Sequence, residues 1–252
     1  MKDKRAVSLG RLGGVARAKS LAADRRSEIA KSAAVARWGT RCEGLATVFR
    51  LSDFYRESSM GRKRKPAPGT LKEDLIRLSA VLDASGTEYA IIGGIAIQPR
   101  RAEPRTTEDI DVAVSSWDDI PRRALRAAGF HGGKRFKFSE NWKAPGGTAV
   151  QFSSDVGFAG VVAKSETISG AGVRFRAASV TDLMWLKADA ALEPRRRLTK
   201  KLTDVGDVVA LVKEHKADYE KLSASEMERV DKVIAKGEAF AALLSDEPSK
   251  TR

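Results

Sequence analysis

Residues 89–114, YAIIGGIAIQPRRAEPRTTEDIDVAV, are the stretch that decides the fold. An apolar strand ends there in Gly93 and Gly94, and a second strand carries Asp109 and Asp111 among apolar residues. Because successive side chains of a strand point to opposite faces, the two carboxylates lie on one face. Two such carboxylates repel each other, and a divalent cation between them relieves the repulsion. The sequence therefore predicts a Mg²⁺ (or Mn²⁺) site held by Asp109 and Asp111.

The paired glycines are suited to binding the phosphates of a ligand beside such a metal site. A backbone without Cβ atoms approaches a triphosphate closely and directs its N–H groups toward it. Each part also has a simpler interpretation, because Gly-Gly often forms only a tight turn and Asp-x-Asp often lies on a solvated sheet edge. The ordered combination of apolar strand, Gly-Gly, basic loop and Asp-Ile-Asp favours the phosphate-binding interpretation.

At these residues the chain resembles the nucleotidyltransferase superfamily, which shares its fold with DNA polymerase β, and more closely the branch of AbiEii-type abortive-infection toxins. The superfamily pattern is an apolar residue, Gly, Gly or Ser, a spacer, and then Asp-x-Asp or Asp-x-Glu. This chain has Ile-Gly-Gly at 92–94, fourteen intervening residues, and Asp-Ile-Asp at 109–111. The branch also favours Arg and Thr before the carboxylates, as in Arg-Thr-Thr-Glu at 105–108.

The resemblance implies a Mg²⁺-dependent nucleotidyltransferase whose substrate is a nucleoside triphosphate. Asp109 and Asp111 then hold the metal and take part in catalysis. The nucleotide-binding residues that the resemblance implies in this part of the chain are Gly93, Gly94, Arg105 and Thr107.

Three downstream motifs extend the resemblance. Members of the branch carry Asp-Leu-x-x-x-Lys on a helix, then a basic segment, then Asp-x-x-Asp at the start of another helix. This chain matches these motifs at residues 182–187, 195–197 and 204–207.

In the toxins the lysine and one aspartate of the last motif are functional, which implies a role for Lys187 and for either Asp204 or Asp207. We place Lys187 and Asp207 among the catalytic residues and Asp204 in the nucleotide site. The simpler alternatives are a lysine whose stem follows an amphipathic helix and an ordinary helix-start carboxylate. Asp182 follows Ser179 by three residues, which predicts a structural capping pair.

One departure from the superfamily pattern concerns a third carboxylate. Many active members supply it from a later strand, where it holds the metal and receives the proton of the attacking hydroxyl. The corresponding strand here is residues 149–152, with Gln151 at the carboxylate position. An amide oxygen ligates Mg²⁺ but is no useful base. Asp155 substitutes for it only if the strand alignment is shifted or the loop folds back.

The order of elements predicts an α+β nucleotidyltransferase core, with a mixed β-sheet and flanking helices, followed by a C-terminal helical extension. Expected strands lie at residues 88–92, 109–114, 135–138, 149–152, 160–163 and 173–176, and residues 180–244 are expected to be helical. The predicted division is a basic helical arm (1–40), a linker (41–69), the core (70–178) and the helical extension (179–252).

The positive charge is concentrated in the N-terminal part. Residues 1–70 hold 17 Lys and Arg against 6 Asp and Glu, a net charge of +11 out of +13 for the chain. This part also resembles short bacterial Gly-Gly-x-Ala-Arg-Ala … Ala-Arg-Trp elements. We expect residues 1–69 to attract RNA or another polyanion. A floppy basic tail that acts as a spacer is the alternative.

Two functions from different classes follow. The first is an enzyme that moves a nucleoside monophosphate from a nucleoside triphosphate to a hydroxyl of RNA, such as tRNA, or of a protein. The resemblance adds a toxin–antitoxin or phage-defence role with an antitoxin partner. The second is a catalytically weak nucleotidyltransferase fold that binds nucleic acid or a partner through its basic arm. The single cysteine and the absence of a long apolar run favour a cytoplasmic protein without a membrane span.

Overall fold

The computed structural model describes residues 45–53 and 69–245, and the side chains up to residue 239. These residues belong to one compact unit, residues 41–252, which is separate from residues 1–40. The predicted basic arm therefore lies outside the described residues.

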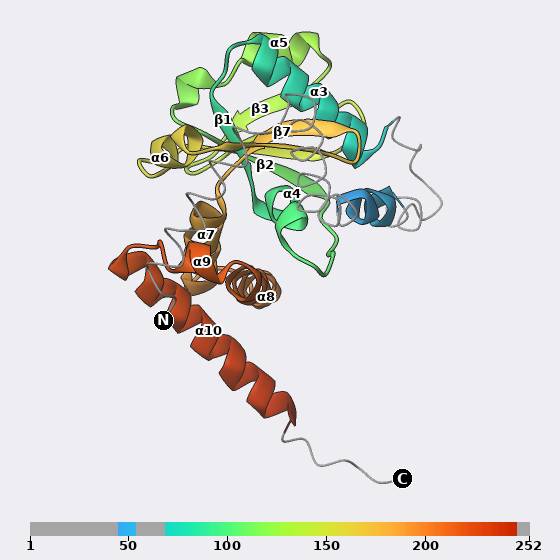
Figure 1. Cartoon of the computed structure of the whole chain (residues 1–252). Helices are drawn as coiled ribbons and strands as arrows, with labels where there is room; N and C mark the ends of the chain where they lie inside the picture. The colour runs from blue at the N-terminus through green and yellow to red at the C-terminus, as the bar shows by residue number, and fades with distance from the viewer. Residues whose placement is uncertain (1–44, 54–68, 246–252) are drawn as a thin grey trace, which may run out of the picture. The chain divides into compact units, whose positions relative to one another are not determined.

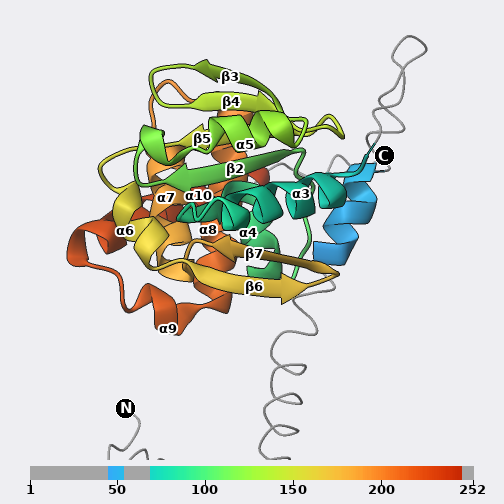
Figure 2. The same cartoon turned by 90° about the horizontal axis from the view of Figure 1, so that it is seen from above.

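A mixed seven-stranded sheet with the strand order β3-β4-β5-β2-β1-β7-β6 forms the centre of this unit (Figures 1 and 2). The strands are β1 (Tyr89–Ile92), β2 (Asp109–Val114), β3 (His131–Arg135), β4 (Glu140–Lys143), β5 (Ala149–Ser153), β6 (Glu166–Gly170) and β7 (Val173–Ala177). β2 pairs antiparallel with β1 and parallel with β5. The predicted strand with the two aspartates therefore lies near the middle of the sheet.

Helices cover both faces of the sheet. Figure 1 shows α3 and α5 on one side, and α4 with the C-terminal helices α7 to α10 on the other. Their bounds are α3 (Leu71–Ala84), α4 (Gly93–Ile97), α5 (Arg122–Ala127), α6 (Phe158–Ala163), α7 (Val180–Leu192), α8 (Leu198–Glu214), α9 (Lys216–Tyr219) and α10 (Ala224–Ser245); two short 3₁₀ helices are η1 (Gln98–Arg100) and η2 (Trp117–Asp119).

α3 shows how local sequence sets these elements. Thr70 and Glu73 form a capping box, in which the Thr70 hydroxyl accepts from the Glu73 N–H and the Glu73 carboxylate accepts from the Thr70 N–H. Capping residues satisfy N–H groups that a helix start leaves without partners. Leucines 71, 75, 78 and 82, spaced for one helical face, are completely or almost completely buried. α3 packs against β7 by this apolar face.

The predicted α+β class and the C-terminal helical extension are confirmed, and two strand predictions are wrong. Residues 160–163, expected as a strand, are part of helix α6, because a short apolar run fits a buried helix as well as a strand. The strand expected at 135–138 lies at 131–135 instead, since Phe136 N–H donates to Ser139 O and closes a turn. β4 and β6 carry too few apolar residues to be recognised from sequence.

The expected linker is also corrected in part. Residues 45–53 are helical, and Leu45, Val48 and Phe49 are buried. Ser52 is buried too, and its hydroxyl donates to the Thr107 carbonyl at 2.5 Å. This segment therefore packs on the core beside the loop that precedes β2. The glycine- and proline-containing part of the expected linker, residues 54–68, lies outside the described residues. Among the residues that the structure describes, no helix has the length and apolarity to cross a membrane.

Candidate active site

Asp109 and Asp111 open the candidate site. They alternate with buried Ile110 and Val112 along β2, so both half-buried carboxylates lie on the same face of the sheet. Both line a polar pocket of about 700 Å³. The other lining residues are Gly94, Arg105, Thr106, Thr107, Glu108, Gln151, Lys187, Arg195, Arg196, Arg197, Lys200, Thr203 and Asp204.

The two glycines are required by close contacts around the carboxylates. Gly93 has a positive φ of 66°, and a Cβ there would collide with an Asp111 carboxylate oxygen. A Cβ at Gly94 would lie only 2.7 Å from the Thr107 Cβ. Side chains therefore do not fit at either position without moving the residues of the site. The glycines let the end of β1 lie directly against the aspartates.

Asp111 has an unusual electrostatic environment. Loss of solvent around its carboxyl raises the pKa of Asp111 to about 7, and the negative charge of Asp109 contributes to the rise. The positive charge of Lys187 acts in the opposite direction, so the pKa would rise further without it. A second cation close to these carboxylates would favour the ionised pair.

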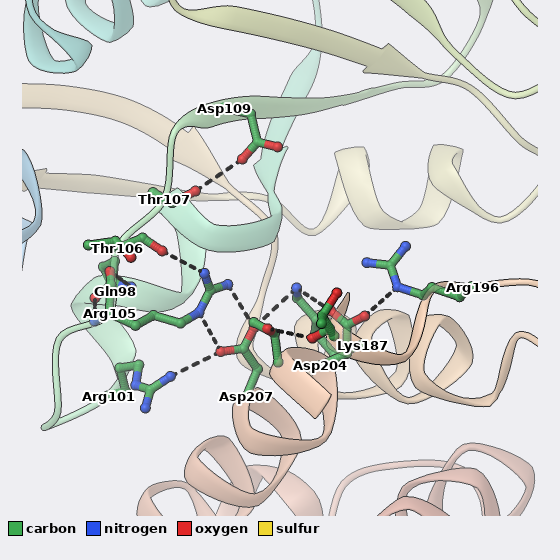
Figure 3. A network of polar contacts seen from close by, with 12 residues as sticks. Gln98, Arg101, Arg105, Thr106, Thr107, Asp109, Lys187, Arg196, Asp204 and Asp207 are labelled. Carbon is green, nitrogen blue, oxygen red and sulfur yellow. Dashed lines mark hydrogen bonds and ion pairs between the residues drawn. The ribbon is translucent and has the colours of Figure 1, made fainter. Parts of the chain in front are cut away.

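Thr107 holds Asp109 in place. Its hydroxyl donates to the Asp109 carboxylate at 3.1 Å, and its own side chain is buried between β2 and α4 (Figure 3). Its carbonyl accepts the hydrogen bond from Ser52. Sequence reasoning missed the contribution of Ser52, because a pairing of residues 55 positions apart leaves no local signal.

Lys187 extends from α7 into an acidic pair on α8. Its ammonium lies 2.8 Å from an Asp204 oxygen and 3.1 Å from an Asp207 oxygen (Figure 3). The Lys187 side chain is 12% exposed, and both aspartates are buried. Arg196 contacts the second Asp204 oxygen through its Nε at 2.5 Å. The loop between α7 and α8 thus brings Lys187, Asp204 and Asp207 together, and all three belong to the motifs recognised in the sequence.

Asp207 also binds the loop that leads into β2. Arg105 donates to both of its oxygens, through Nε at 2.7 Å and Nη2 at 2.8 Å. Arg101, which the sequence placed in the basic loop without a partner, adds a contact of 3.0 Å from Nη1. Asp207 is therefore fully buried against three cations and does not line the pocket, whereas Asp204 does. Asp207, which the sequence placed among the catalytic residues, thus lies in a buried ion-pair cluster, whereas Asp204, placed in the nucleotide site, lines the pocket.

Gln151 lies where the alignment of strands predicted it. It pairs with Asp111 across the parallel strands β2 and β5, and it lines the same pocket. Asp155 lies in the exposed loop beyond β5 and is not among the pocket residues. The loop does not fold back to supply a third carboxylate.

The pocket offers oxygen ligands of the kind that Mg²⁺ prefers. The described residues contain no group of three or more His, Cys, Asp or Glu side chains placed to hold a metal. Mg²⁺ is commonly bound through one or two carboxylates together with waters and substrate phosphates. Two carboxylates on one strand, an amide oxygen on the next, and the raised pKa of Asp111 fit such an ion.

A mixed sheet that presents two aspartates beside a pair of glycines at a helix start is typical of the class of nucleotidyltransferases. Residues 76–248 match the family described as nucleotidyl transferase AbiEii toxin, type IV toxin–antitoxin system. This chain belongs to that family. No curated protein matches the chain.

Several solved structures are similar to this chain at low sequence identity. An antigenic nucleotidyltransferase-like protein from Paracoccidioides brasiliensis is 20% identical, with 69% of this chain and 92% of that chain covered and a TM-score of 0.49. The antibiotic-resistance factor ANT(2'')-Ia is 18% identical, with 67% and 91% covered and a TM-score of 0.42. JHP933 from Helicobacter pylori is 14% identical, with 69% and 95% covered and a TM-score of 0.38.

Proposed function

We propose that this nucleotidyltransferase moves a nucleoside monophosphate from a nucleoside triphosphate to a hydroxyl of RNA, such as tRNA, or of a protein. The observation that carries the proposal is the placement of Asp109 and Asp111 on one sheet face, against Gly93 and inside a pocket lined by cations. Family membership supports a triphosphate as the donor and an antitoxin as a partner.

In this proposal Asp109 and Asp111 hold Mg²⁺, and Gln151 contributes an amide oxygen beside them. When bound, the ion neutralises phosphate charge and polarises the phosphorus–oxygen bonds. The Thr107 hydroxyl fixes the orientation of the Asp109 carboxylate. Gly93 and Gly94 let the backbone after β1 lie directly against Asp111 and Thr107, because a Cβ at either position would collide with these side chains.

The reaction forms one bond and breaks one. The acceptor oxygen bonds to the α-phosphorus, and the bond from that phosphorus to the α–β bridging oxygen breaks, so that pyrophosphate leaves. The acceptor hydroxyl also loses its proton. Gln151 cannot take it, since an amide is not a base at neutral pH. The proton passes to water, to which the open pocket gives access.

Cations around the pocket stabilise the negative charge that develops on the phosphates. Arg195, Arg197 and Lys200 line the pocket, and each is exposed without an ion pair to another described residue. Lys187 and Arg105 are held by buried aspartates, so their positive groups are oriented before a nucleotide arrives. Preoriented charges of this kind stabilise a transition state without reorganisation.

Gln151 supports a second candidate function. A site without a third carboxylate suits a catalytically weak member that binds nucleic acid or a partner through its basic N-terminal arm. The two functions differ in one observable, because only the enzyme releases pyrophosphate.

The test uses full-length protein with each of the four nucleoside triphosphates labelled at the α-phosphorus, total tRNA and Mg²⁺. Transfer of label to tRNA or to protein, lost when the divalent ions are chelated, supports the enzyme. Label that stays in the triphosphate pool with every acceptor, while tRNA still binds, supports the binding protein.

A further inference from the structure

The candidate site continues across the sheet as a row of exposed polar residues. Gln151 on β5 lies beside Asp111, and Asn141 on β4 lies beside Gln151. Lys134 on β3 completes the row next to Asn141. Residues paired across neighbouring strands project from the same face. Three strand spacings separate Asp111 from Lys134, which is about 14 Å.

A second row runs parallel to the first. It starts at Asp109 and passes through Ala149 and Lys143 to His131. The residues of both rows that lie on β3, β4 and β5 are all exposed. The residues that alternate with them on β4 and β5, namely Trp142, Val150 and Phe152, are buried on the opposite face. The face of β3, β4 and β5 that adjoins the two aspartates is therefore open to solvent.

The strands of this open face present lysines and no carboxylate on it. Residues 131–153 contain a single acidic residue, Glu140, against four Lys and Arg. Glu140 is buried on the other face, where Arg122 contacts it at 2.7 Å and Trp142 donates to it. Lys134 and Lys143 thus project from the open face with no carboxylate of β3, β4 or β5 beside them.

Exposed aromatic rings lie at the turn between β3 and β4. Phe136 is 47% exposed and Phe138 is 66% exposed. The Lys134 ammonium lies 5.2 Å from the centre of the Phe136 ring, and that of Lys137 lies 4.8 Å from the Phe138 ring. Basic and aromatic side chains alternate through this turn, and neither ring is buried in the core.

We propose that the open face of β3, β4 and β5, with Phe136 and Phe138 at its turn, binds a single-stranded segment of an acceptor RNA and leads it to Asp109 and Asp111. This inference rests on the proposed function, and it names the acceptor as RNA. Lysines on the strands neutralise backbone phosphates, and the exposed rings stack on unpaired bases. Proteins that bind single strands without sequence preference combine these two features.

The chemistry of the face distinguishes RNA from other occupants. An apolar partner segment would bury the rings but leave Lys134 and Lys143 without partners. A polyanion with planar bases uses both the cations and the rings.

The test measures binding of a short fluorescent single-stranded RNA, and of a duplex RNA of the same sequence, to the full chain at two salt concentrations. Phe136→Ala/Phe138→Ala should weaken binding of the single strand about tenfold and binding of the duplex little, since only unpaired bases stack. Lys134→Ala/Lys143→Ala should weaken both and flatten the salt dependence. Ile76→Ala, an exposed apolar residue on α3, and Lys216→Ala on α9 are the matched controls.

A separate measurement distinguishes this inference from the proposed function. Stabilisation of each variant against heat by a nucleoside triphosphate with Mg²⁺ should equal that of the wild type, because none of these residues lines the nucleotide pocket. Wild-type RNA affinity in both double variants would overturn the inference and leave the transferase proposal intact. The expected losses of affinity in a protein that transfers no label would support the RNA-binding face and overturn the transferase proposal.

Discussion

Asp111 and Gln151 lie directly opposite each other on the parallel strands β2 and β5, at the position where an active site of this class would gain its third carboxylate. The pairing means that a single substitution on β5 places a carboxylate beside the two already present. It also means that the loop residue Asp155 is not needed to explain the site. We therefore expect the identity of residue 151 to affect the rate of nucleotide transfer.

Gln151→Glu should raise the rate of nucleotide transfer by at least about tenfold, because a positioned general base contributes about 10²–10⁴ in rate. The same substitution should lower the melting temperature in the absence of Mg²⁺, since three carboxylates then repel one another. Ala217→Glu, at an exposed position on α9, adds the same charge away from the aspartates and is the control. A rate unchanged by Gln151→Glu would show that the third carboxylate does not limit turnover.

Asp111→Asn tests the raised pKa through protein stability. The folded pKa of Asp111, about 7, exceeds its unfolded value of about 3.9, so the folded state binds the proton more tightly. The stability that this group contributes is present below pH 4 and is lost as the pH rises through 7. Without metal, the melting temperature of Asp111→Asn relative to wild type should therefore increase from pH 5 to pH 8. Asp118→Asn, at an exposed position, should show a constant difference. A constant difference for Asp111→Asn as well would contradict the raised pKa.

Gly94→Ala should reduce both stability and transfer. The added Cβ would meet Thr107, which holds Asp109, and overpacking of this kind costs about 1–3 kcal/mol. Gly206→Ala on α8 is the control, because nothing lies within 4 Å of its Cβ position. In a helix that change should stabilise the protein by about 0.5–1 kcal/mol. Thermal denaturation and transfer assays on both variants measure these effects. A Gly94→Ala variant with the stability and transfer rate of wild type would contradict the close contact between Gly94 and Thr107.

Asp207→Asn should destabilise the protein strongly, because Arg105, Arg101 and Lys187 lose a buried partner. Removing one partner of a buried ion pair costs about 3–5 kcal/mol. Asp204→Asn should destabilise the protein less than Asp207→Asn, because Lys187 still has its ion pair with Asp207. The main effect of Asp204→Asn should be a lower rate of transfer. Denaturant unfolding and transfer rates of the two variants separate these effects. Equal losses of stability would mean that the two aspartates have the same structural role.

Removing residues 1–40 should separate the basic arm from the core. These residues hold ten Lys and Arg against three Asp and Glu, so the truncated chain should bind tRNA more weakly and with a shallower salt dependence. The cut falls at residue 40 and not at 69, because Leu45, Val48 and Phe49 pack on the core. A tRNA titration at two salt concentrations measures the effect. Identical slopes for the two proteins would identify the arm as a spacer.

The part of the site carried by local sequence was predictable. The alternation around Asp109 and Asp111 specifies one strand, and it fixes the common face of both carboxylates. The cap at Thr70 was equally local, because the partners are three residues apart. The predicted position of Gln151 followed from an aligned strand, and its pairing with Asp111 confirms that alignment.

Long-range pairings were not predictable. The sequence pattern alone did not show which of Asp204 and Asp207 lines the pocket, and only the packing of α7 on α8 and on the loop before β2 places Asp204 there. Arg101 was recognised only as part of a basic loop, since its partner Asp207 lies 106 residues away. Strands β4 and β6 escaped prediction because their stability comes from neighbouring strands and not from their own apolar content.

The central claim is that the protein transfers a nucleotidyl group and that this transfer requires Asp109 and Asp111. The most direct measurement compares triphosphates labelled at the α- and at the γ-phosphorus, with wild type, Asp109→Asn and Asp111→Asn, in the presence of tRNA and Mg²⁺. The account predicts that wild type transfers the α-label and not the γ-label, and that each variant transfers at most about a hundredth as much while it stays folded. Transfer of the γ-label, or wild-type transfer by either variant, would contradict it.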